Sequence, residues 1–294
     1  MELNREIVTA PPRAAATVVM LRDVPLGLEV FLMQRHGKSD VLGGAYVFPG
    51  GKVDAADTEL DMAAHLDQDL HTLHTSLSET DIDPLTAAGL YVAAMREVFE
   101  ESGVLFVHAD SVGGVDVVDD FAANLQVGCS FNAALTRTAL RLQTRHLVPW
   151  SRWITPTSPS LMNKRFDTRF FVASVPSGQV ARHDDFETTE SVWLRPRAAL
   201  EQYWDGQIEL APPQIMSLVH LTHYADVASV LDAARRAGPR LIQPEPFEHE
   251  GIRVICYPGD EQHPVKERAM PGPLRLRYRN KLFEPVEGFE ALFE

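Results

Sequence analysis

Short apolar runs separated by turn residues predict a series of β-strands along the chain. Residues 14–21 and 28–34 are rich in aliphatic side chains, and Pro25 and Gly27 between them indicate a turn. A short strand is expected within residues 47–51, where it ends in a cluster of a proline and two glycines. The same pattern predicts further strands at residues 104–107, 147–150, 166–175, 191–194, 253–257 and 274–278.

Helical periodicity is clearest between residues 84 and 102. Asp83 is expected to cap this helix, Pro84 suits its first position, and Gly103 suits the left-handed residue that ends it. Its apolar stripe consists of Ala88, Val92, Met95 and Phe99. Thr58 and Asp61 predict a capping box that opens a short helix reaching residue 66. Further helices are expected at 70–77, 121–140, 196–204 and 212–237.

The alternation of strands and helices predicts an α/β protein, with too few strand–helix–strand units for a doubly wound sheet. The chain has 294 residues, of which 45% are hydrophobic and 23% charged, values typical of a globular protein with a sizeable core. No apolar run approaches the ~20 residues that span a bilayer, and the N-terminal residues show no secretory signal. Two cysteines, Cys129 and Cys256, cannot form a disulfide framework, so we expect a cytoplasmic location.

Charge is unevenly distributed along the chain. The net charge is −14, which disfavours nucleic acid and anionic membranes as partners. Residues 57–101 contain eleven acids and one base, whereas residues 121–170 contain seven bases and one acid. Such neighbouring segments suit a metal-bound phosphate ester, whose cation and anion need opposite charges. Two solvated surfaces of opposite charge are the simpler interpretation of the same pattern.

Three carboxylates gather near the end of the predicted 84–102 helix. Glu97, Glu100 and Glu101 stand at positions i, i+3 and i+4, so they are expected on one side of the helix, opposite its apolar stripe. They repel one another, and the helix dipole disfavours anions at this end. A hard divalent cation such as Mg²⁺ would compensate, with Arg96 orienting one carboxylate. The alternative is an exposed acidic helix end neutralised by solvent and Arg96.

The sequence context of these carboxylates resembles the Nudix hydrolases. The family signature begins with a glycine, continues with a glutamate, and ends with a segment that contains Arg-Glu followed by Glu-Glu and a glycine. Gly51 begins it here, Asp57 stands at the first glutamate position, and residues 96–104 match its second half. Thirty-eight residues separate Asp57 from Arg96, where the family usually has seven. The glycine pair that follows Phe48 and Pro49 also lets the backbone approach a metal or phosphate closely.

Later stretches resemble one branch of that family, the coenzyme A diphosphatases with a long insert in the signature. These stretches are residues 150–156, 164–170 and 210–214. Arg35 and residues 44–51 partly match a coenzyme A signature of another branch, but Asp40 replaces an expected arginine there. The resemblance extends over roughly residues 14–220 and leaves the proline-rich tail unexplained.

The resemblance implies a Nudix α/β/α sandwich with a mixed sheet. The Nudix domain would comprise residues 14–220, with a helical insert at 58–82, followed by a C-terminal helical extension at 221–294. Leucines and Met62 in the insert suggest that it packs as a small lobe.

The resemblance also implies a metal-dependent diphosphatase that uses Mg²⁺ or Mn²⁺. By motif position, Glu97, Glu100 and Glu101 would be metal ligands, and one of them or a nearby acid would be the general base. Arg96 would complete the catalytic group, and Gly51 would offer its carbonyl to the metal. Asp57, one methylene shorter than glutamate, would pair with Arg96.

Candidate substrate contacts come from the basic segments and the glycine loop. Arg35 is a candidate for binding a 3′-phosphate, and the backbone of Gly50 for approaching the diphosphate. Arg165 and Arg169 share a strand face with Asp167, so they suit phosphate binding or, alternatively, a salt-bridged surface. Trp150 and Trp153 suit adenine stacking or, more simply, core packing. His220 and His223 suit a metal site only weakly, because no third ligand accompanies them.

The function that the resemblance implies is hydrolysis of coenzyme A or acyl-coenzyme A to 3′,5′-ADP and a phosphopantetheine product. The nearest alternative is the same chemistry on NADH, ADP-ribose, a dinucleotide or a nucleotide sugar. A Nudix-fold binding module without turnover is a third interpretation, which the intact acidic turn disfavours. The expected partner is a small nucleotide, with no nucleic acid and no membrane, and the sequence is compatible with a homodimer.

Overall fold

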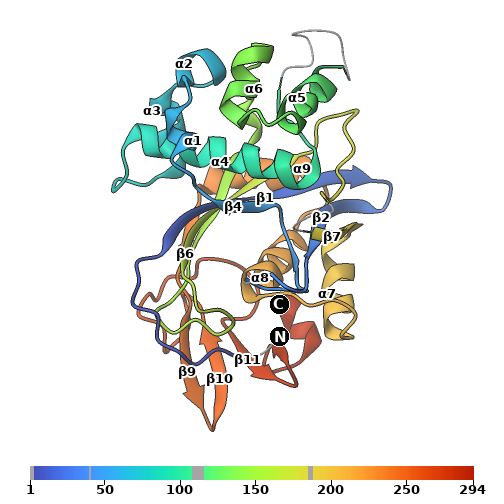
Figure 1. Cartoon of the computed structure of the whole chain (residues 1–294). Coiled ribbons are helices and arrows are strands. Elements are labelled where there is room, and N and C mark those ends of the chain that lie inside the picture. Colours follow the sequence, from blue (N-terminus) through green and yellow to red (C-terminus); the bar gives the residue numbers. More distant parts are fainter. Residues whose placement is uncertain (1–2, 40, 108–115, 185–187) are drawn as a thin grey trace.

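A mixed β-sheet forms the centre of the computed structural model, which describes residues 3–39, 41–107, 116–184 and 188–294 (Figure 1). Its strands are β1 (Arg13–Val24), β2 (Gly27–Arg35), β3 (Tyr46–Val47), β4 (Gly50–Lys52), β5 (Val148–Ile154), β6 (Phe166–Ser174), β7 (Thr188–Leu194) and β8 (Arg240–Ile242). The order is β3-β2-β1-β6-β5-β8, with β4 also paired to β1 and β7 to β2. Parallel pairing of β1 with β6 and of β5 with β8 makes the sheet mixed, as predicted.

Strand alternation divides the sheet residues between two hydrophobic cores. Side chains of successive residues point to opposite faces of a strand. In β1, Val18 and Met20 join one core, whereas Val19 and Leu21 join the other. Phe170 and Phe171 of β6 divide in the same way. The sheet is therefore covered on both faces, as an α/β sandwich requires.

Each face carries its own group of helices. One core includes side chains of α2 (Met62–His65), α3 (Leu70–Leu77), α4 (Pro84–Ser102), α5 (Asp116–Gln126) and α6 (Phe131–Thr138), and the short α1 (Ala56–Glu59) contacts α4. Figure 1 shows these helices together on one side of the sheet. The opposite core includes side chains of α7 (Pro196–Trp204), α8 (Pro212–Leu221) and α9 (Val227–Ala237).

Helix α4 has the predicted bounds because its end signals are local. The carboxylate of Asp83 accepts hydrogen bonds from the backbone N–H groups of Leu85 and Thr86, and Pro84 occupies the first turn. Gly103 adopts φ +70°, a left-handed conformation that glycine adopts without strain. The helix crosses the sheet beside β1 and β4, so its acidic end lies next to the glycine loop.

The insert forms the expected helical lobe against α4. Its apolar side chains are buried in the same core as α4, namely Leu60, Met62, Leu66, Leu73 and Leu77, with Leu70 partly buried. The predicted Thr58–Asp61 capping box is wrong. Asp61 instead caps α2 through the backbone N–H of Ala64, and Thr58 donates its hydroxyl to the carbonyl of Ala55.

This packing predicts slow hydrogen exchange in the middle of the insert. Amides of α3 are held by helical hydrogen bonds and by the burial of Leu73 and Leu77 against the core. Hydrogen–deuterium exchange should therefore show protection in α3 approaching that of α4. Exchange of every α3 amide at the rate of an unstructured peptide would contradict the packed lobe.

Two predicted long helices are each broken by a second capping signal. In place of one helix at 121–140, Gly128 adopts φ +89° and Ser130 caps α6. In place of one helix at 212–237, α8 ends at Leu221 and Asp226 opens α9 with a capping box. The predicted strand at 104–107 is wrong too, because only Val107 makes an isolated bridge, to Leu142.

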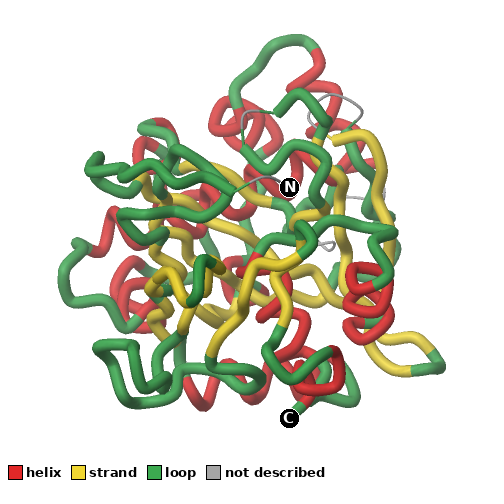
Figure 2. The backbone as a smooth tube through the Cα atoms, turned by 90° about the horizontal axis from the view of Figure 1, so that it is seen from below, coloured by secondary structure: helices red, strands yellow, loops and turns green. Residues whose placement is uncertain are grey.

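The C-terminal residues form a second sheet as well as a helix. After α9, strand β8 joins the central sheet, and β9 (Glu245–His249), β10 (Ile252–Cys256), β11 (Arg275–Arg279) and β12 (Leu282–Glu284) form an antiparallel sheet in the order β12-β11-β10-β9. The expectation of a helical extension thus holds for α9 and for a 3-10 helix at the end of the chain (Phe289–Phe293), while strands lie between them. This sheet lies in the lower part of the molecule in Figure 1, and Figure 2 views the molecule from below. No helix in the described ranges is long and apolar enough to cross a membrane.

Candidate active site

A cavity of about 680 Å³ opens between the glycine loop, the end of α4 and the C-terminal sheet. Its acidic end is lined by Glu97 and Glu101 together with Gly50 and Gly51. Alternate residues of β1 and β6 form its floor, and the first turn of α8 and parts of the C-terminal extension form another wall. The predicted acidic turn and the predicted glycine loop therefore meet in one cavity.

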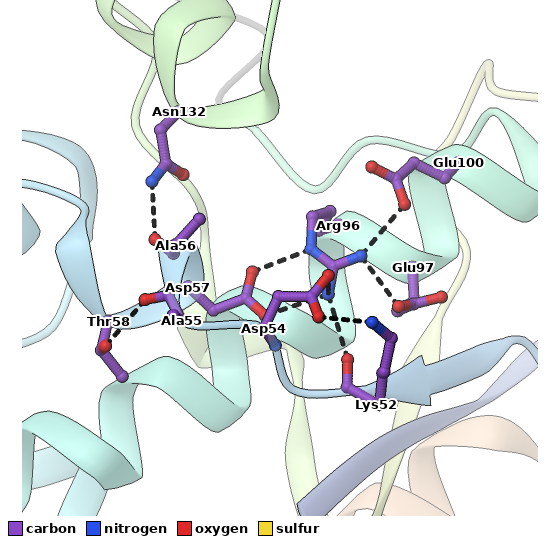
Figure 3. A network of polar contacts seen from close by, with 10 residues as sticks. All are labelled: Lys52, Asp54, Ala55, Ala56, Asp57, Thr58, Arg96, Glu97, Glu100 and Asn132. Atoms are coloured by element: carbon purple, nitrogen blue, oxygen red, sulfur yellow. Dashed lines mark hydrogen bonds and ion pairs between the residues drawn. The ribbon is translucent and has the colours of Figure 1, made fainter.

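Arg96 and Asp57 join the two halves of the split signature (Figure 3). The Arg96 guanidinium donates from Nε and Nη2 to the two Asp57 carboxylate oxygens, at 2.8 and 2.9 Å. Asp57 is 1% exposed, and its Oδ2 also accepts from the backbone N–H of Asp54 at 2.8 Å. The predicted pairing is confirmed, and the shorter aspartate reaches Arg96 because α1 begins directly at this point.

The remaining Arg96 donors hold the neighbouring acids and the loop. Nη1 donates to Glu97 at 2.8 Å and to Glu100 at 3.0 Å, and Nη2 donates to the carbonyl of Lys52. Burial lowers the pKa of the guanidinium, but the hydrogen bonds to Asp57 and the charge of Glu97 outweigh burial and raise it overall. Arg96 is thus a permanently charged support behind the acidic turn.

Glu97 and Glu101 are each fitted against a glycine of the loop. A Cβ atom at Gly51 would lie 2.5 Å from Cδ of Glu97, so a larger residue there would force this carboxylate to move. Glu101 Oε2 accepts a hydrogen bond from the backbone N–H of Gly50 at 2.8 Å. Glu101 is only 4% exposed, which corrects the expectation that the acidic side of the helix lies away from the core.

Gly50 is required at its position by conformation and by space. It has φ +153°, and a Cβ atom there would lie 2.4 Å from the carbonyl oxygen of Ala16 on β1. Because the two backbones approach closely at Gly50, β4 can pair with β1. The N–H of Gly50 at the same time donates to Glu101.

Glu100 lies farther out than the other two acids. Its side chain is 44% exposed and is turned toward Arg96. Partial burial raises the pKa of the Glu100 carboxyl, and the charge of Arg96 opposes this. Among the described residues, no three acidic, histidine or cysteine side chains are close enough together to hold a metal ion. The structure thus brings Glu97 and Glu101, but not Glu100, to the cavity.

Two carboxylates still fit a magnesium ion. Mg²⁺ is commonly held by one or two carboxylates, with waters and substrate phosphates completing its coordination. Glu97 and Glu101 supply hard oxygen donors at the cavity wall, and Gly51 lines the cavity beside them. The donor set therefore suits a cation shared with a bound diphosphate.

Cationic side chains also line the cavity. Arg35 at the end of β2 is among them, as predicted for a phosphate contact, and Arg13, Lys52 and Lys164 accompany it. A β-bulge between Gln34 and Arg35 accompanies the end of regular pairing between β2 and β7. Arg13, Lys52 and Lys164 were not singled out from the sequence, because their convergence depends on the sheet order.

Arg165 and Arg169 lie outside the cavity lining, contrary to the phosphate-binding expectation. Arg169 is 5% exposed and faces the insert, where its guanidinium pairs with Glu79 and Asp167. Arg165 donates to the backbone carbonyls of Thr155 and Ala10. The physical reason is the strand alternation, since Phe166, Thr168 and Phe170 occupy the cavity face of β6. The alternative interpretation, in which these arginines form salt bridges, is confirmed for Arg169, but its ion pairs are buried and not at the surface.

The tryptophans and histidines serve mainly in packing. Trp150 is 5% exposed and stacks on His220, with ring centroids 4.9 Å apart. Burial lowers the pKa of His220 to about 4, so this ring is neutral near pH 7. Trp153 packs against Phe170 and Tyr257, and one part of it lines the cavity.

Comparison with known proteins agrees with this geometry. The family model of the NUDT19 Nudix domain matches residues 85–221. Acyl-coenzyme A diphosphatase NUDT19 of Xenopus laevis is 28% identical over 278 residues, with 80% of this chain and 71% of the relative covered. The protein of that name from Homo sapiens is 27% identical over 241 residues, with 69% of this chain and 63% of the relative covered.

A solved structure shows the same architecture. The crystal structure of a NUDIX hydrolase from Alicyclobacillus acidocaldarius is 26% identical, with a TM-score of 0.59, and covers 76% of this chain and 97% of its own. The mixed sheet between helical layers is therefore an arrangement that the chain shares with this NUDIX hydrolase. Over residues 85–221 the chain is similar to the NUDT19 Nudix domain, and its resemblance to the coenzyme A diphosphatase branch of the Nudix hydrolases is confirmed.

Proposed function

We propose that the protein hydrolyses the diphosphate bond of coenzyme A or acyl-coenzyme A, giving 3′,5′-ADP and (acyl-)phosphopantetheine. The observation that carries this proposal is the character of the cavity. Glu97 and Glu101 occupy one end, while most of the remaining wall is apolar. A nucleotide joined through a diphosphate to a long, weakly polar arm matches this division. The names of the frog and human relatives support the same substrate class.

Glu97, Glu101 and the carbonyl of Gly51 are the proposed cation-binding groups, with Mg²⁺ or Mn²⁺ as the ion. When bound, such an ion neutralises phosphate charge and lowers the pKa of a coordinated water. Arg96 keeps Glu97 oriented, and the Gly50 N–H keeps Glu101 oriented. Glu100 as a third ligand stays a prediction, as does the choice of the acid that accepts the proton of the attacking water.

Arg35 and Gly50 are the proposed substrate contacts among the residues predicted from the sequence. Arg35 brings positive charge to a protein whose overall charge of −14 repels polyanions. We propose no substrate contact for Arg165 or Arg169, because their guanidiniums are held by other groups. The cytoplasm is the proposed compartment, consistent with two unpaired cysteines.

A substrate panel tests the function directly. The purified protein is incubated with Mg²⁺ and with coenzyme A, an acyl-coenzyme A, NADH, ADP-ribose or diadenosine tetraphosphate, and products are separated by chromatography. The expected products are 3′,5′-ADP and phosphopantetheine, formed fastest from the coenzyme A compounds and abolished by EDTA. A preference for NADH or ADP-ribose would overturn coenzyme A as the substrate and would keep hydrolysis of a diphosphate bond as the reaction. Absence of turnover on the whole panel would favour a binding module.

Replacing Arg35 with alanine should remove discrimination for the 3′-phosphate. A charge-assisted contact contributes about 1.5–3 kcal/mol, or roughly 10- to 150-fold in kcat/KM. The wild type should prefer coenzyme A over dephospho-coenzyme A by at least about tenfold. Arg35→Ala should lose this preference and keep its rate on dephospho-coenzyme A.

Arg22→Ala is a suitable control for this experiment. Arg22 lies on β1, pairs with Glu29 and covers Trp193 away from the cavity lining. Its kinetic preference should match that of the wild type. Equal wild-type rates on coenzyme A and dephospho-coenzyme A would overturn the assignment of Arg35.

A further inference from the structure

The part of the cavity away from the acids is built by segments that lie far apart in the sequence. The loop after β5 supplies Leu161 and Met162, the first turn of α8 supplies Pro212 and Pro213, and the C-terminal extension supplies Pro246 and Ile255. Prolines fix the backbone of this wall, so it is largely preformed. The C-terminal extension therefore completes the cavity.

Two polar atoms interrupt this apolar wall. Gln214 on α8 and Ser160 in the loop after β5 both line the cavity, and each is 7% exposed. Neither Gln214 Oε1 nor Ser160 Oγ has a hydrogen-bond partner within the part of the chain that the structure describes. Buried polar atoms are almost always hydrogen-bonded, because an unpaired one loses its contacts with water. Two such atoms in one cavity indicate a ligand that supplies the partners.

The required ligand is extended, mostly apolar and equipped with both hydrogen-bond donors and acceptors. A secondary amide meets this need, since its N–H can donate to Gln214 Oε1 and its carbonyl can accept from the Ser160 hydroxyl. The pantetheine arm of coenzyme A contains two secondary amides joined by methylene groups. The ribose–diphosphate portion of ADP-ribose contains none.

We propose that Gln214 and Ser160 bind the amides of the pantetheine arm, in a subsite closed by the C-terminal extension. This inference rests on the proposed function and goes beyond it, because it assigns the arm to named residues and gives the extension a role in substrate selection. Gln214 lies next to Pro212 and Pro213, so its position at the cavity follows from the way α8 begins.

Binding of 4′-phosphopantetheine and of 3′,5′-ADP, each measured alone by calorimetry, tests the subsite without turnover. Gln214→Leu and Ser160→Ala should each weaken binding of 4′-phosphopantetheine by about 3- to 10-fold, the range for one lost hydrogen bond. Binding of 3′,5′-ADP should stay unchanged. With coenzyme A as substrate, the same variants should raise KM more than they lower kcat, because the contact is made equally before and during reaction.

Thermal stability separates this role from a structural one. Gln214→Leu removes a buried polar atom that has no hydrogen-bond partner among the residues that the structure describes, so its Tm should equal or exceed that of the wild type. Gln207→Leu is the matched control, because Gln207 is exposed and lies outside the cavity lining. It should leave both affinities unchanged.

The outcomes distinguish the two proposals. Failure of the wild type to hydrolyse coenzyme A would overturn the proposed function, whatever the variants do. Hydrolysis with unchanged 4′-phosphopantetheine affinity in both variants would overturn the subsite alone. A lower Tm together with equal loss of both ligands would show a structural role for Gln214 and would also overturn the subsite.

Discussion

Replacing Glu101 with glutamine should lower kcat by about 100-fold or more while the fold is kept, a loss typical of a key electrostatic group. Glutamine has nearly the same shape and still offers a carbonyl oxygen to the Gly50 N–H, so the glycine loop should stay in place. What is lost is the negative charge at the end of the cavity where the cation and the diphosphate are proposed to meet. Steady-state kinetics at saturating Mg²⁺ measure the effect, and thermal denaturation reports on the fold.

Glu201→Gln provides the control for this charge change. Glu201 lies on α7 and pairs with Arg197, with about half of each side chain exposed. Its replacement removes the same charge and should leave kcat within twofold of the wild type, a change of roughly 0.4 kcal/mol. Near-normal turnover by Glu101→Gln at saturating Mg²⁺ would remove Glu101 from the mechanism.

Helix α4 could be predicted from sequence because its signals are local. Asp83, Pro84 and Gly103 act within one turn of the helix ends, and each adopts the expected role. The single helices predicted at 121–140 and 212–237 were wrong, because each range contains two helices. Apolar periodicity continues across each break, while the N-caps at Ser130 and Asp226 begin a new helix. Periodicity alone does not reveal such a restart.

In the candidate site, too, the parts that depend on a local motif could be predicted, and the parts that depend on tertiary packing could not. Gly51, Glu97 and Glu101 are close together because a recognisable motif joins the loop to α4. Strand alternation places Arg169 on the face away from the cavity, and its partner there is Glu79 of the insert. That pairing spans 90 residues of sequence, and no local pattern indicates it.

The sequence around Gln214 contains recognisable signals, but they do not reveal that its side chain lines the cavity. It ends the stretch of residues 210–214 that resembles the coenzyme A diphosphatase branch, and the proline pair before it predicts a helix start. Neither signal indicates that its side chain lies in a cavity with Ser160, which is 54 positions earlier in the chain. That information comes only from the tertiary arrangement of α8, the loop after β5 and the C-terminal extension.

Removing the carboxylate of Asp57 should cause the largest loss of stability. The Asp57→Ala substitution leaves Arg96, whose side chain is 11% exposed, without its bidentate partner (Figure 3). Breaking a buried ion pair by removing one partner typically costs about 3–5 kcal/mol, because the remaining charge is left uncompensated. Urea denaturation should show this decrease in the free energy of unfolding. Glu97 and Glu100 offset part of it, since both also accept from Arg96.

Two further variants show whether the loss comes from burial of the charge. Glu29→Ala breaks the more exposed pair with Arg22 and should change the free energy of unfolding by less than about 1 kcal/mol. The double variant Asp57→Leu/Arg96→Met replaces the buried charges by apolar groups and should be less destabilised than Asp57→Ala. A similar small loss for Asp57→Ala and Glu29→Ala would contradict a structural role for the buried pair. In that event Arg96 would not be the support that holds the two halves of the split signature together.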